Sequence, residues 1–132
     1  MTSKNVLVVD DDKELTQSVK AYLEARGYAV RTAHSGAEGQ REIESARPDL
    51  VVLDIMMDSD ADGFNLAYKL KGDEATRDIP IIILSGFTGH LKDKFRSFEF
   101  VMEREWPAAV HLEKPASLAA IGAAIEQLLA NA

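Results

Sequence analysis

The chain has 132 residues, enough for one compact domain with a real core and too few for two ordinary domains. Its hydrophobic share of 46% and charged share of 28% are those of a soluble globular protein, and no apolar run approaches the roughly 18 residues of a membrane span. The net charge of −7 disfavours direct nucleic-acid binding, and the absence of cysteine excludes disulfides and thiolate chemistry. Because the first residues lack a secretory signal pattern, we expect one cytoplasmic domain spanning residues 1–132.

Short runs of branched apolar residues recur along the chain and predict five β-strands. Polar residues bound each run, and helix-like patterns separate the runs from one another. Runs of this kind are typical of parallel strands that are buried on both faces. The expected strands cover residues 5–9, 29–33, 50–53, 81–84 and 110–112.

Helical spacing of apolar residues predicts five helices, four between the strands and one after the last strand. The first helix is expected to begin after Asp12, a good N-cap residue, and to stop at Gly27. The second begins after Ser35 and the third covers about residues 63–71. Ser117 is expected to cap the last helix.

The second helix has the weakest helical pattern. Gly36 and Gly39 lower its intrinsic helix propensity. Its only apolar stripe consists of Ala37, Ile43 and Ala46.

Alternating strands and helices imply right-handed crossovers, and therefore a parallel sheet with helices on both faces. With five strands and five helices, the expected fold is a flavodoxin-like, doubly wound, three-layer α/β/α domain with strand order 2-1-3-4-5. Ligands bind to such folds beyond the carboxyl ends of strands 1 and 3, where the strand order reverses. Asp10 and Asp11 follow the first of these strands and Asp54 follows the other, so their carboxylates should meet.

A cluster of carboxylates predicts a bound cation or a bound proton, and a hard metal ion is the simpler explanation. Two such charges about 4 Å apart repel by roughly 4 kcal/mol at an effective dielectric near 20. Mg²⁺ fits well, because it takes one or two carboxylates, retained waters and a phosphate oxygen. Beside this metal the Asp54 carboxylate can attack phosphorus. Ser85, after the fourth strand, can donate to a phosphoryl oxygen, and the Lys114 ammonium, after the fifth, can hold the transferred group.

This set of residues, in this order and spacing, resembles the receiver domain of two-component response regulators, and the resemblance covers essentially the whole chain. The motifs that carry it are Val-Val-Asp-Asp-Asp at 8–12, Leu-Asp-Ile-Met-Met at 53–57, Leu-Ser-Gly at 84–86 and Glu-Lys-Pro at 113–115. The resemblance implies a single-domain, chemotaxis-regulator-like phosphoacceptor. In this reading Asp54 receives a phosphoryl group from a sensor histidine kinase or a phosphotransfer protein.

The resemblance also implies the roles of the surrounding residues. It makes Asp11 a direct Mg²⁺ ligand and Asp10 a ligand that acts partly through water, with Asp54 and the backbone carbonyl of Met56 completing the protein's share. It makes Ser85 and Lys114 the residues that hold the phosphoryl group. Such a protein is a signalling phosphoacceptor and not a conventional enzyme, because its reactions are its own Mg²⁺-dependent phosphorylation and slow dephosphorylation.

The output surface is expected around strands 4 and 5 and helix 4. His111 stands where the family usually has an aromatic switch residue. Either its ring exchanges between buried and exposed positions as Ser85 moves toward the phosphate, or it is a structural surface residue. The segment 86–110 looks longer than usual for this family and is rich in aromatic residues. We therefore expect the face from helix 4 to helix 5 to contact a downstream protein or a second copy of the chain.

Several alternatives remain open at this stage. Residues 58–63 match the first half of an EF-hand calcium loop, although Lys69 stands where a bidentate Glu is needed; the alternative is a solvated turn in which Asp62 caps the third helix. A flavin mononucleotide protein would need a neutral phosphate loop after the first strand, where residues 10–12 are all acidic. A phosphohydrolase of the haloacid dehalogenase type would need Gly-Thr at positions 13–14, which are Lys-Glu. A degenerate receiver that signals by binding alone conflicts with the intact set of acids, Ser and Lys.

Overall fold

A computed structural model of the chain describes residues 4–54, 62–85, 110–113 and 117–130. Within this part, five parallel strands form one sheet in the order β2-β1-β3-β4-β5, which is the order expected from the sequence. The strands are β1 (Asn5–Val9), β2 (Ala29–Ala33), β3 (Leu50–Asp54), β4 (Ile81–Ser85) and β5 (Val110–Glu113).

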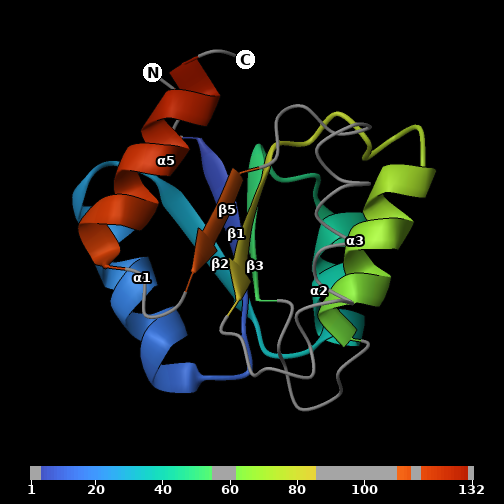
Figure 1. Cartoon of the computed structure of the whole chain (residues 1–132), viewed down its shortest axis with the longest axis horizontal. Helices are drawn as coiled ribbons and strands as arrows, with labels where there is room; N and C mark the ends of the chain where they lie inside the picture. Colours follow the sequence, from blue (N-terminus) through green and yellow to red (C-terminus); the bar gives the residue numbers. More distant parts are fainter. Residues whose placement is uncertain (1–3, 55–61, 86–109, 114–116, 131–132) are drawn as a thin grey trace.

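Helices cover both faces of this sheet. Figure 1 shows α1 and α5 against one face and α2 and α3 against the other. The described part is therefore a three-layer α/β/α arrangement of the flavodoxin-like type. The fourth helix of the prediction falls within residues 86–109, outside the described ranges. No helix of the described ranges has the length and apolar character to cross a membrane. The helices are α1 (Lys13–Ala25), α2 (Gly36–Ser45), α3 (Asp62–Gly72) and α5 (Leu118–Ala130).

The core consists of two apolar layers, one on each face of the sheet. Along β1, Val6 and Val8 belong to the layer beneath α1 and α5, whereas Leu7 and Val9 belong to the layer beneath α2 and α3. Side chains alternate in this way because successive residues of a strand point to opposite faces. Since both faces are covered, the three central strands β1, β3 and β4 are almost continuously apolar, which is why the sequence shows continuous runs there and not an alternation.

The helix starts follow the predicted capping residues. Asp12, Ser35 and Ser117 each accept a hydrogen bond from the backbone N–H three residues further on, at distances of 3.1, 3.1 and 3.0 Å. Each side chain thereby satisfies one of the N–H groups that have no partner within the helix. At the other end of α1, Gly27 adopts a φ of 96°, a left-handed conformation that glycine allows without strain.

The predicted second helix is confirmed as α2, and of its apolar stripe only Ile43 is buried. Ala37 and Ala46 are exposed, and the buried residues of this helix are Gly39 and Ile43. A Cβ atom on Gly39 would lie 3.0 Å from Leu66 Cδ2 and 3.1 Å from a methyl carbon of Val9. The glycine therefore lets α2 approach α3 and β1 closely, and its low helix propensity is offset by this packing.

A side chain of the edge strand β2 holds the end of α2. The guanidinium group of Arg31 donates to the backbone carbonyls of Glu42 and Ala46, at 2.8 and 2.6 Å, and also contacts the Glu42 carboxylate at 3.1 Å. The Glu42 carbonyl also accepts the backbone N–H of Ala46 at 3.1 Å, so Arg31 adds a second donor to this carbonyl and supplies a donor to the carbonyl of the C-cap residue Ala46.

Candidate metal site

The register of the two central strands brings Asp10 and Asp54 together. In the β1–β3 pair, Val8 lies opposite Val52 and Val9 lies opposite Leu53. One residue further along, Asp10 follows β1 at the level of Asp54, the last residue of β3. Because side chains alternate along each strand, both carboxylates belong to the face covered by α1 and α5. Neighbouring strands lie about 4.8 Å apart, so the two side chains are neighbours.

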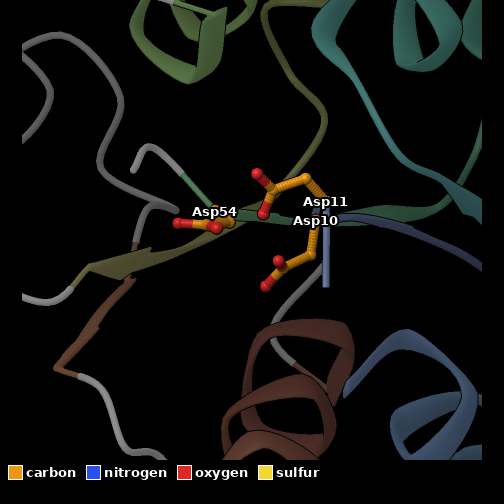
Figure 2. Close-up of side chains that lie close together, drawn as sticks. All are labelled: Asp10, Asp11 and Asp54. Carbon is orange, nitrogen blue, oxygen red and sulfur yellow. The ribbon is translucent and has the colours of Figure 1, made fainter. Parts of the chain in front are cut away.

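Three carboxylates converge at this edge of the sheet. One carboxylate oxygen from each of Asp10, Asp11 and Asp54 lies within 4.8 Å of the others. Asp10 and Asp54 are 0% and 1% exposed, and Asp11 is half-buried. Figure 2 shows the carboxylates of Asp10 and Asp11 on the side of their backbone that faces Asp54. The cluster predicted from the strand ends is therefore present.

Backbone hydrogen bonds fix the loop that carries two of these acids. The N–H of Asp10 donates to the carbonyl of Ala33 at 3.0 Å, which ties the loop to the end of β2. The Oδ1 atom of Asp10 accepts from the N–H of Asp12 at 2.9 Å. Asp12 in turn caps α1, so this loop is held both by the sheet and by the first turn of the helix.

Thr16 and His34, which sequence patterns did not single out, lie next to the loop that carries Asp10 and Asp11. Thr16 is 0% exposed, and its hydroxyl donates to the carbonyl of Lys13 at 3.0 Å and lies 3.2 Å from Nε2 of His34. A threonine inside a helix and a histidine after a strand share no spacing that would link them. Their contact depends on how α1 packs against the end of β2, which a local pattern does not encode.

The donor set suits Mg²⁺. Opposite ligands of an octahedral Mg²⁺ lie about 4.2 Å apart, since each Mg–O distance is about 2.1 Å. Oxygens within 4.8 Å of one another need only a small contraction to reach such positions. At 4.8 Å and an effective dielectric near 20, each pair of charged carboxylates repels by about 3.5 kcal/mol. A divalent cation would offset this repulsion, and three carboxylates leave further coordination positions for water or a phosphate oxygen.

The other predicted site residues are placed only in part. Ser85 is the last residue of β4 and pairs in register with Glu113, next to Leu84, which pairs with Asp54. His111 is the second residue of β5, opposite Ile83. Lys114 and the backbone carbonyl of Met56 lie outside the described residues. So do residues 58–61 of the calcium-like motif, whose last two residues, 62 and 63, begin α3.

Comparisons with known proteins agree with this fold and show the family of the chain. The family model of the response regulator receiver domain matches residues 6–126. The DNA-binding dual master transcriptional regulator RpaA of Synechocystis is 37% identical over 94 residues, which make up 71% of this chain and 38% of RpaA. The chain thus spans well under half of this relative's length.

Solved structures match over almost the whole chain. A CheY-like response regulator receiver domain protein from Methanospirillum hungatei superposes with a TM-score of 0.82 at 25% identity, covering 98% of this chain and 96% of that one. The receiver domain of a signal transduction histidine kinase from Syntrophus aciditrophicus gives 0.81 at 27% identity, covering 98% and 92%.

The chain belongs to the response regulator receiver family. Receiver domains are the signalling phosphoacceptors of two-component systems, and they typically bind Mg²⁺ at an acidic pocket. The flavin and haloacid dehalogenase alternatives are therefore set aside.

Proposed function

We propose that Asp54 is the phosphoacceptor of this receiver domain and that Asp10, Asp11 and Asp54 hold Mg²⁺, together with the backbone carbonyl of Met56. The observation that carries this proposal is the cluster of three carboxylates, two of them buried, at the ends of β1 and β3. The phosphodonor is the phosphohistidine of a sensor histidine kinase or a phosphotransfer protein.

Asp54 suits the role of nucleophile better than its two neighbours. It ends a central strand that is paired on both sides, with β1 and with β4, so its backbone position is well defined. Asp10 instead accepts the N–H of Asp12, which holds its carboxylate in the loop. Asp11 lies on the loop itself and is half-buried. These differences support Asp54 as the attacking group, while all three residues contribute to the metal site.

The transfer exchanges one bond to phosphorus for another. An Asp54 oxygen forms a P–O bond while the P–N bond of the phosphohistidine breaks; the bonding pair stays on nitrogen, and the ring leaves neutral because its other nitrogen is protonated. Bound Mg²⁺ would offset negative charge on the phosphoryl oxygens. Asp10 and Asp11 would hold the metal in place for this step. Later, water attacks phosphorus and the P–O bond to Asp54 breaks, giving the free carboxylate, inorganic phosphate and a proton.

We propose the remaining roles by analogy with the family. Ser85 and Lys114 hold the phosphoryl group at the ends of β4 and β5. Ser85 and His111 switch the surface around these strands, which then binds a downstream protein or a second copy of the chain. We propose a cytoplasmic location for this exchange. The net charge of −7 disfavours direct DNA binding by this domain itself, so we propose that its switched surface contacts a protein.

Intact-mass measurement after incubation with Mg²⁺ and acetyl phosphate tests the proposal. The wild-type chain should gain one phosphoryl group, and Asp54→Ala should gain none. Asp73→Ala, which removes an exposed aspartate outside the cluster, is the matched control and should react like the wild type. Chelation of Mg²⁺ should abolish the gain. Phosphorylation of Asp54→Ala at the wild-type rate would overturn the proposal.

A further inference from the structure

We propose that Thr16 and His34 are positioning residues that hold the Asp10–Asp12 loop in its metal-binding geometry. The inference rests on the function proposed above and adds two residues that do not touch the metal themselves. They act through a chain of hydrogen bonds that runs from the end of β2 through the first turn of α1 to the carboxylate of Asp10.

The first link is the Thr16 hydroxyl. The residue is completely buried, and its hydroxyl lies 3.0 Å from the carbonyl of Lys13 and 3.2 Å from Nε2 of His34. A hydroxyl has one proton to donate and can also accept. It donates to the carbonyl of Lys13, so the contact with His34 requires a proton on the ring nitrogen. We therefore assign the proton to Nε2, which makes the ring the donor and Thr16 the acceptor.

The second link runs from Thr16 to the acidic loop. The backbone N–H of Thr16 donates to the carbonyl of Asp12 at 3.0 Å. The N–H of Asp12 donates to Oδ1 of Asp10 at 2.9 Å. A shift of Thr16 therefore moves the peptide groups that orient the Asp10 carboxylate.

The third link anchors His34 itself. Its backbone N–H donates to the Glu38 carboxylate at 3.0 Å, and its Nδ1 lies 3.9 Å from the same oxygen. Ser35, the next residue, caps α2, and Ala33, the preceding one, accepts the N–H of Asp10. His34 is thus fixed by the start of α2 on one side and by β2 on the other, so it can serve as a fixed point for Thr16.

The hydrogen bonds through Thr16 and His34 oppose the repulsion among the three carboxylates. Without a cation, three carboxylates within 4.8 Å of one another favour a wider loop, and a link that resists widening keeps the ligands close to their bound spacing. Hydrogen-bonding partners behind metal ligands commonly change metal affinity by about 10–100-fold. Because Thr16 and His34 act one bond further out, we expect an effect of about three- to tenfold.

The test compares threonine variants at two sites. Thr16→Val keeps the shape of the side chain and removes the hydroxyl, whereas Thr16→Ser keeps the hydroxyl. Thr76→Val is the matched control, because the buried Thr76 hydroxyl also donates to a backbone carbonyl, that of Leu70 at 2.6 Å. Thr76 precedes β4 and so belongs to the amino end of the strands, opposite the end that carries the acids. His34→Phe and His34→Gln form a second pair, in which only glutamine keeps an N–H donor.

Two measurements are made on each variant. Calorimetric titration with Mg²⁺ gives the dissociation constant, and amide hydrogen exchange in the metal-free protein reports on the N–H of Asp12. Thr16→Val and His34→Phe should raise the dissociation constant about three- to tenfold and speed the exchange of this amide. Thr16→Ser, His34→Gln and Thr76→Val should stay within about twofold of the wild type.

The outcomes separate the two proposals. If the wild type binds Mg²⁺ and accepts phosphate at Asp54, but Thr16→Val leaves both the affinity and the Asp12 exchange unchanged, the positioning role is wrong and the proposed function stands. Equal weakening by Thr16→Val and Thr76→Val would likewise overturn it, because the effect would then be one of general stability. A wild-type protein that binds no Mg²⁺ would overturn both.

Discussion

Replacing Asp54 by asparagine should stabilise the metal-free protein. The substitution keeps the size of a side chain that is 1% exposed, and it removes one of three clustered negative charges. Asp54 forms two carboxylate pairs in the cluster, each with oxygens no more than 4.8 Å apart. At an effective dielectric near 20, each pair contributes about 3.5 kcal/mol of repulsion when both groups are charged.

The net change should be smaller than this repulsion. Hydrogen bonds and neighbouring charges offset part of it, and asparagine accepts hydrogen bonds less strongly than a carboxylate. We therefore expect the free energy of unfolding in a chelator to rise by about 1–3 kcal/mol. For a chain of this size, about 2 kcal/mol corresponds to a rise of roughly 5–10 °C in the melting temperature.

Thermal and urea unfolding, with chelator and with Mg²⁺, measure the effect. The wild type should gain about 1.4 kcal/mol from Mg²⁺ at ten times its dissociation constant, and Asp54→Asn should gain less because it lacks a ligand. Glu24→Gln removes the same charge from an exposed position on α1 and controls for the net charge of −7. A variant at Asp54 that is no more stable than the wild type in chelator would refute the reasoning.

Three further predictions concern packing and helix ends. Gly39→Ala should lower the free energy of unfolding by about 1 kcal/mol, because its Cβ would meet buried side chains. Gly72→Ala should not lower it, because nothing lies within 4 Å of a Cβ at that position. Urea unfolding of the two variants measures this difference. Gly122→Ala should also destabilise, because its Cβ would lie 2.8 Å from the ring of Tyr22, and Tyr22→Leu should relieve the loss in a double-mutant cycle. Arg31→Met should cost about 1–2 kcal/mol and speed amide exchange in the last turn of α2; unchanged exchange there would contradict the proposed contact.

The sequence predicted the strands and the acidic cluster well because both depend on local order. Continuous apolar runs mark strands buried on both faces, and the acids stand directly after two of these runs. Parallel strands bring their carboxyl ends to one edge, so Asp10 and Asp54 had to be neighbours once the strand order was right. The capping residues Asp12 and Ser35 were predictable for the same reason, since each acts on a backbone group three residues away.

The features that the sequence did not predict depend on contacts between distant elements. From the sequence, Gly39 only lowers the helix propensity of α2. Its close approach to Val9 and Leu66 explains why a glycine occupies this position. Thr16 and His34 meet across 18 positions of the chain without a shared motif. Neither relationship has a period or a spacing, because each depends on where a helix sits on the sheet.

The register of β1 and β3 has a consequence for how this domain tolerates changes in length. Val8 opposite Val52 sets the level at which the two central strands reach their acids. Deleting one residue within β1 would turn Asp10 to the opposite side of the sheet, toward α2 and α3, and so separate it from Asp54. The site thus depends on the number of residues in two short strands, because a second deletion would return Asp10 to its original face but leave it about 6.6 Å from the level of Asp54.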